Sequence, residues 1–145
     1  FTNYQYHNIG VPQNHDLMSK NVVDPKTYVD HGLLNNPEVT DKKHDGKMKV
    51  PTLRNVAVTG PYMHNGVFRK LSTVVEFYDK YVNEERTINP ETGKAWSKPE
   101  VEVGETDMKL LKEAKALSDK KVKALVAFMN ALTDKRYEGL VKDED

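Results

Sequence analysis

The stretch Lys49–Tyr81 reads KVPTLRNVAVTGPYMHNGVFRKLSTVVEFYDKY, and it holds the densest run of unusual residues in the chain. Its first part, VPTLRN at 50–55, is a corner: the proline restricts the preceding residue to extended backbone, and the threonine is a good N-cap for a helical turn. Its second part, TGPYMHNG at 59–66, is a tight turn crowded with possible ligands. Its third part, 71–82, is predicted to be an amphipathic helix.

The helix predicted over residues 71–82 has a clear apolar stripe. Four residues fall at i, i+3, i+4 and i+7 on one face: Val74, Phe77, Tyr78 and Tyr81. That spacing is typical of a helix that packs on a core. The T-x-x-E spacing of residues 73–76 fits a capping box, with the serine at 72 as the other candidate N-cap.

Two further helices are predicted over residues 106–117 and 119–133, and Ser118 is expected to cap the second. The second helix carries a stripe of five apolar residues: Val122, Leu125, Val126, Met129 and Leu132. Residues 83–105 are broken by NP, TG and KP pairs and are expected to be loop. Trp96 in this loop has two possible roles, as an electron relay or as a cover for the edge of the core. The sequence therefore predicts a mainly α fold with long loops.

Composition narrows the function classes. The 145 residues are enough for one domain with a modest core. Lysine plus arginine number 22, as do aspartate plus glutamate, so we expect no nucleic-acid partner. No run approaches the ~18 apolar residues of a membrane span. The absence of cysteine from the sequence excludes disulfides, thiolate-bound zinc and iron–sulfur clusters within these residues, and also a C-x-x-C-H haem-attachment motif.

The stretch around VPTLRN resembles the signature of the bacterial di-haem cytochrome c peroxidase family, which includes the MauG-type enzymes. The family pattern is approximately F-K-V-P-T-L-R-N-V-x-x-T-x-P-Y-x-H-x-G followed by a helix with a haem ligand; Met48 stands where the pattern has phenylalanine. Residues 1–12 resemble the family segment F-T-x-x-x-x-H-N-I-G-x-P, which follows the second haem-attachment motif closely. The resemblance implies that residues 1–145 are the carboxy-terminal cytochrome c-like helical domain, with the haem c attachment segment expected just upstream of Phe1.

The resemblance also implies a haem ligand on the helix at 71–82. The family has methionine at the position of Tyr78 in the peroxidases and tyrosine in the MauG-type branch, and Met63 is the competing candidate ligand. Tyrosinate is a hard anionic donor that stabilises ferric iron, whereas a thioether stabilises ferrous iron. Ligation by Tyr78 therefore predicts a haem of low potential.

Other candidate site residues lie in the same stretch. The guanidinium of Arg54 suits a haem propionate, or else holds the corner through loop carbonyls. His64 is expected to hydrogen-bond a propionate or the backbone, and His7 is either a ligand or a hydrogen-bonding loop residue. The resemblance implies a calcium site made by the backbone carbonyls of Thr59 and Pro61, a chemistry that suits calcium.

Two functions from different classes follow. The first is a haem-binding electron-relay domain of a periplasmic di-haem peroxidase, with no catalytic residue in this chain and no activity of the fragment by itself. Its partners would be the missing amino-terminal haem domain and either a small electron-donor protein, for hydrogen peroxide reduction, or a protein substrate, for MauG-like oxidation. The second is a haem-free helical structural or interaction module, which the lack of cysteine favours.

Overall fold

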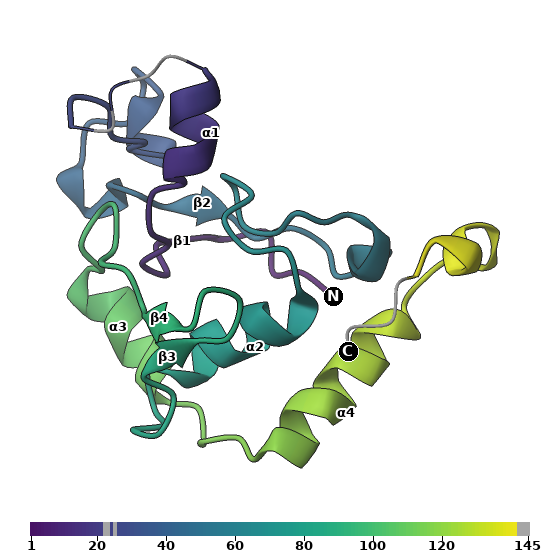
Figure 1. The fold of residues 1–145 in the computed structure, drawn as a ribbon. Coiled ribbons are helices and arrows are strands. Elements are labelled where there is room, and N and C mark those ends of the chain that lie inside the picture. Colours follow the sequence, from purple (N-terminus) through teal and green to yellow (C-terminus); the bar gives the residue numbers. More distant parts are fainter. Residues whose placement is uncertain (22–23, 25, 142–145) are drawn as a thin grey trace.

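Four short α-helices and two very short antiparallel strand pairs make up the regular structure of the computed structural model, which describes residues 1–21, 24 and 26–141 (Figure 1). The helices are α1 His15–Lys20, α2 Leu71–Asp79, α3 Glu105–Lys112 and α4 Asp119–Asn130. The strands are β1 Tyr6–His7, β2 Met48–Lys49, β3 Ile88–Asn89 and β4 Lys94–Ala95. Single 3₁₀ turns form at Leu33–Asn35, Lys42–His44 and Val56–Val58, and a longer one at Lys135–Leu140. The prediction of a mainly helical fold is confirmed.

Strands β1 and β2 form an antiparallel pair that joins two segments far apart in the sequence. The strands are antiparallel, with Tyr6 opposite Lys49 and His7 opposite Met48. This pairing brings the first residues of the chain alongside the start of the 49–81 stretch (Figure 1). It therefore places His7, which the sequence analysis assigned to a loop, in a paired strand.

Helix α2 is the centre of the core, and it buries side chains on two sides. Leu71 and Val75 pack with Val122 and Met129 of α4 in one cluster. Phe77 belongs to a second cluster with Val11 and Phe68. Of the single stripe predicted for this helix, only Phe77 is buried; Val74 and Tyr81 are partly buried, and Tyr78 is 44% exposed. The prediction of one core face is therefore wrong, because α2 has neighbours on both sides.

The start of α2 differs from the prediction. Thr73 is a fully buried residue inside the helix and does not cap it, so the predicted capping box is wrong. The carboxylate of Glu91, from the loop between β3 and β4, instead accepts the backbone N–H groups of Arg69 (2.9 Å) and Lys70 (2.9 Å). A carboxylate from a distant segment thus takes the place of a local cap. It accepts hydrogen bonds at the start of the helix, next to the positive end of the helix dipole.

The last two helices are shorter than predicted. Helix α3 ends at Lys112, not 117, and α4 ends at Asn130, not 133. Ser118 is the residue before α4, but its side chain makes no capping hydrogen bond. Of the predicted stripe, Val122 and Met129 are buried, whereas Leu125 remains 41% exposed because it faces a cavity.

The loop at residues 8–11 is held against the end of α2. Gly10 has a φ of +69°, and a Cβ there would lie 2.5 Å from the Tyr81 hydroxyl oxygen. The Tyr81 hydroxyl donates to the backbone carbonyl of Ile9 at 2.8 Å. A residue with a side chain at position 10 would therefore be strained and would push this contact apart.

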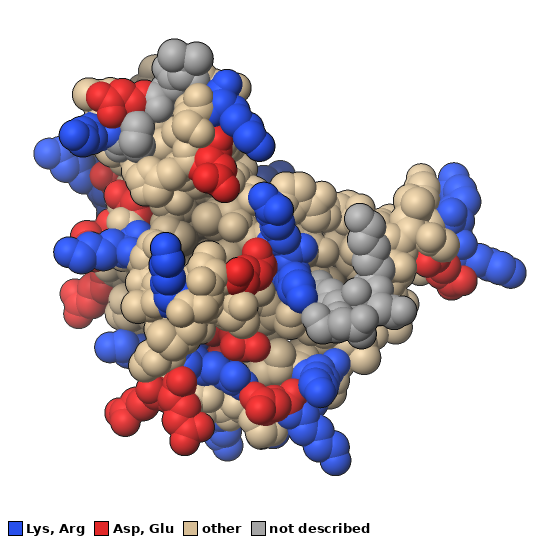
Figure 2. Space-filling model, in the orientation of Figure 1, with Lys and Arg blue, Asp and Glu red and all other residues tan. Residues whose placement is uncertain are grey.

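Both signs of charge are spread over the surface. Figure 2 shows lysine and arginine side chains interspersed with aspartate and glutamate over the face drawn. This pattern agrees with the equal numbers of basic and acidic residues.

Candidate cofactor site

A cavity of about 460 Å³ lies between α2, α3, α4 and the end of the β1–β2 strand pair. Most of the side chains that form its walls are aliphatic, and they come from segments spread over the whole chain. They include Ile9, Val50, Val82, Leu110, Leu111, Ala114, Leu117 and Leu125. The polar groups in the wall are few and specific: Tyr78, His7, Asp79, Asp107 and Lys115.

Tyr78 stands in the α2 wall of this cavity. It is 44% exposed, yet its ring lies in a concave wall and stacks edge to face on Phe77 with 6.3 Å between ring centroids. Burial raises the pKa of the Tyr78 phenol above its ordinary value, since the phenolate would lose hydration there. A phenol in this position stays protonated unless a cation compensates the charge of the phenolate.

His7 and Asp107 form a hydrogen-bonded pair in the wall of the cavity. His7 Nδ1 lies 2.7 Å from a carboxylate oxygen of Asp107, which is 3% exposed. The same carboxylate accepts the backbone N–H of Asn8 at 3.0 Å and lies 3.3 Å from Lys47 Nζ. Burial works to raise the pKa of Asp107, but these hydrogen bonds and the lysine charge outweigh it and hold that pKa below its ordinary value.

This pairing orients the imidazole of His7. With Nδ1 donating to Asp107, Nε2 is the ring nitrogen left for a second interaction, and His7 lines the cavity. Carboxylate–histidine pairs of this kind fix the orientation of a ring that serves a metal or cofactor site. The sequence named His7 as a candidate, but nothing in the sequence links it to an aspartate one hundred residues later.

Asp79, the residue after Tyr78, is a second buried charge in the wall with three hydrogen-bond donors around it. Its carboxylate accepts from the backbone N–H of Leu117 (2.8 Å), the Asn83 amide (2.8 Å) and Arg86 Nε (3.2 Å). Arg86 also bridges to Asp119 at 2.6 Å. These bonds tie the end of α2 to the loop before α4, so they fix the spacing of two cavity walls.

The other predicted cofactor-binding side chains lie away from this cavity. Met63 packs against the Phe68 and Phe77 cluster on another side of α2. Arg54 is exposed in the corner before the 3₁₀ turn at Val56–Val58. Within the described residues, Tyr78 alone of the four predicted cofactor-binding side chains lines the cavity.

His64 lies near acidic groups. Its Nε2 is 4.0 Å from a carboxylate oxygen of Asp30. Burial lowers the pKa of His64, although the charges of Asp30 and Glu100 work against this shift. His64 therefore has a carboxylate neighbour in this chain, and its role toward a cofactor stays a prediction.

Thr59 and Pro61 lie on either side of Gly60 in an exposed turn. Their carbonyls are thus accessible to an ion, and the calcium site stays a prediction. Among the described residues, no group of three or more histidine, cysteine, aspartate or glutamate side chains could hold a metal ion. A calcium ion here would depend on backbone carbonyls and on ligands from elsewhere.

The cavity fits a haem by the chemistry of its donors and walls. A macrocycle needs aliphatic walls, which the cavity has, and an axial donor, which the Tyr78 phenol can supply. The polar edge of a haem needs hydrogen-bonding groups, and the His7–Asp107 pair also lines the cavity. The cavity and its donors therefore suit this cofactor.

Comparison with known proteins supports the same conclusion. MauG, the methylamine utilization protein of Paracoccus denitrificans, is 49% identical over 145 residues, which are 99% of this chain and 37% of MauG. The crystal structure of the diheme peroxidase BthA from Burkholderia thailandensis superposes with a TM-score of 0.68 at 28% identity, covering 96% of this chain and 35% of BthA. The chain belongs to the MauG and di-haem cytochrome c peroxidase family.

Other family members match over shorter stretches. Cytochrome-c peroxidase IdrP1 of a Pseudomonas species is 45% identical over 65 residues, 42% of this chain and 16% of IdrP1. No protein-family model matches the sequence. The chain spans little more than a third of the length of MauG or BthA. In the described residues, no helix has the length and apolar character needed to cross a membrane.

Proposed function

We propose that residues 1–145 are a haem-binding, cytochrome c-type electron-relay domain of a periplasmic di-haem peroxidase-family enzyme, with Tyr78 as an axial haem ligand. The observation that carries the proposal is the Tyr78 phenol in the wall of an aliphatic cavity, in a chain 49% identical to MauG. Haem supplies one-electron chemistry when bound; the attachment motif is absent from these residues, so attachment through thioethers needs cysteines outside them.

The cavity walls exclude water and set the electrostatics at the cofactor. Leu110, Leu111 and Leu125 present hydrocarbon to the cavity, so a charge there is poorly hydrated. The raised pKa of Tyr78 means that its phenol gives up its proton only to a strong counter-charge, as ferric iron provides. Because phenolate is a hard anion, it favours the ferric state and lowers the reduction potential.

The His7–Asp107 pair is proposed to hold the polar edge of the cofactor. In its doubly protonated form, His7 would donate its Nε2–H to a propionate, while Asp107 accepts from Nδ1 and keeps the ring in one orientation. The carbonyls of Thr59 and Pro61 are proposed as calcium ligands.

The relay role implies an amino-terminal haem domain as a partner, where peroxide would react. Within the family, we favour MauG-like oxidation of a partner protein over the reduction of hydrogen peroxide with electrons from a small donor protein. Tyrosine at position 78 and the 49% identity to MauG support this choice. A low-potential relay is poorly matched to a high-potential electron donor.

Absorption spectra of the full-length, haem-loaded protein test the proposal. We expect a Soret band, and we expect the ferric spectrum to change in Tyr78→Phe. The matched control is Tyr81→Phe, which removes a hydroxyl one turn further along, where it donates to the Ile9 carbonyl. Equal spectra for the wild type and Tyr78→Phe would remove Tyr78 from the iron, and no Soret band would favour the haem-free module.

A further inference from the structure

Aromatic rings form a continuous path from the cavity wall to the opposite surface of α2. The Tyr78 and Phe77 ring centroids are 6.3 Å apart, and those of Phe77 and Trp96 are 5.6 Å apart. Phe77 is fully buried, whereas Trp96 is only partly covered. Both ring pairs meet edge to face, which is a favourable aromatic geometry. The path thus joins the candidate ligand to the surface without a gap.

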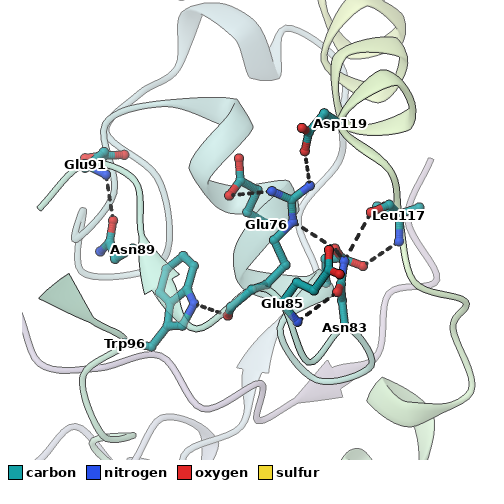
Figure 3. Close-up of polar contacts among 10 residues, drawn as sticks. Glu76, Asn83, Glu85, Asn89, Glu91, Trp96, Leu117 and Asp119 are labelled. Carbon is teal, nitrogen blue, oxygen red and sulfur yellow. Dashed lines mark hydrogen bonds and ion pairs between the residues drawn. The ribbon is translucent and has the colours of Figure 1, made fainter. Parts of the chain in front are cut away.

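Trp96 is held in one orientation at the outer end of this path. Its indole N–H donates to the backbone carbonyl of Arg86 at 2.7 Å, as Figure 3 shows. Its ring also meets Phe68 edge to face, with centroids 5.9 Å apart. A carbonyl acceptor at the N–H stabilises positive charge on an oxidised indole. The indole is therefore held in one orientation, with an acceptor that stabilises its oxidised form.

A cation lies beside the same rings and raises the potential at which they lose an electron. The Lys80 ammonium is 4.0 Å from the Phe77 ring centroid and 5.5 Å from that of Trp96. This cation is attracted to the neutral rings but repels a positive indole. Only a strong oxidant can then oxidise Trp96, which protects the residue from weak oxidants in solution.

We propose that Trp96 is a surface redox site that gives one electron to the haem of this domain, after that haem has passed an electron to the peroxide-oxidised haem of the amino-terminal domain. The electron leaves the indole and reaches the cofactor through Phe77 and Tyr78. The indole becomes a cation radical whose proton stays on the ring nitrogen, hydrogen-bonded to the Arg86 carbonyl, and the oxidised cofactor is reduced by one electron. Phe77 is a tunnelling bridge and is not itself oxidised. This inference rests on the proposed function, since it requires the haem.

The test locates the radical from the position of its spin-trap adduct and does not depend on enzyme activity. The full-length, haem-loaded protein is treated with hydrogen peroxide and a nitrosoalkane spin trap, and the adducts are located by peptide mass spectrometry. We expect an adduct on Trp96 that requires both haem and peroxide, that is lost in Trp96→Phe, and that falls several-fold in Phe77→Leu. Because Trp96 is only partly buried, Trp96→Phe should fold normally, so the test can still be made with this variant if Phe77→Leu folds poorly.

Tyr28 is the internal control, because it is 46% exposed and has no ring contact with this path. Adducts on Tyr28 equal to those on Trp96 would indicate radicals diffusing in solution and would overturn the inference. A Soret band without any adduct on Trp96 would overturn this inference and leave the proposed function standing. Absence of a Soret band would overturn both, so the two failures are distinguishable.

Discussion

Replacement of Arg86 by methionine is the most informative perturbation of the cavity wall. The carboxylate of Asp79 has a side-chain exposure of 0%, and Arg86 is its cationic partner at 3.2 Å. Loss of one partner from a buried ion pair costs about 3–5 kcal/mol, because an uncompensated charge stays buried. Two neutral donors, the Leu117 N–H and the Asn83 amide, remain on Asp79. We therefore expect a loss near the lower end, about 3 kcal/mol.

Urea unfolding followed by circular dichroism at neutral pH measures this loss. Arg136→Met is the matched control: its partner is Asp134 at 3.6 Å, and its side chain is 75% exposed, so we expect a loss of under about 1 kcal/mol. Adding Asp79→Asn to Arg86→Met should restore part of the stability, since the buried charge is then gone.

An Arg86→Met protein that loses no more stability than Arg136→Met would contradict this expectation. In that case, the bridges of Arg86 to Glu76 and Asp119 would be surface pairs of little worth, and Asp79 would be satisfied by its neutral donors.

Three further predictions concern the charges around α2 and the cavity. Asp107→Asn should lower the free energy of unfolding by about 2 kcal/mol at neutral pH. Because the pKa of Asp107 in the folded protein lies below 3.8, the stability difference from the wild type should shrink as the pH falls through that lowered pKa. A difference in urea unfolding that stays constant with pH would contradict this. Burial lowers the pKa of Lys80 from 10.5 to about 8, so the unfolded chain binds more protons above pH 8 and stability should rise toward pH 10, by at most about 1.4 kcal/mol per pH unit. Lys80→Met should lack that rise, and the same slope in both proteins would assign it elsewhere. Glu91→Gln should lower the stability by about 0.5–1 kcal/mol through the start of α2, and an unchanged melting temperature would show that the carboxylate charge is not needed there.

The helices could be predicted from the sequence because their signals are local. The apolar spacing in 71–82 placed α2 within three residues of its end, and the stripe of the last helix identified the buried Val122 and Met129. Tyr78 could be singled out because the family resemblance assigns a role to that position. These inferences depend on neighbours within one or two turns of the helix.

The rest of the site depends on contacts between distant residues. His7 contacts Asp107 only because β1 pairs with β2 and α3 begins beside that strand pair. Glu91 replaces a local cap at α2, so the threonine at 73 could become a core residue. No spacing rule links residues that far apart, so neither the partner of His7 nor the carboxylate at the start of α2 could be predicted from the sequence.

Ligation of iron by Tyr78 is the central claim, and resonance Raman spectroscopy of the ferric, full-length protein tests it most directly. We predict phenolate vibrations that are enhanced through the iron, shift when the protein carries ring-deuterated tyrosine, and vanish in Tyr78→Phe but persist in Tyr81→Phe. A haem-loaded wild type without isotope-sensitive phenolate bands, or bands that survive in Tyr78→Phe, would contradict the account.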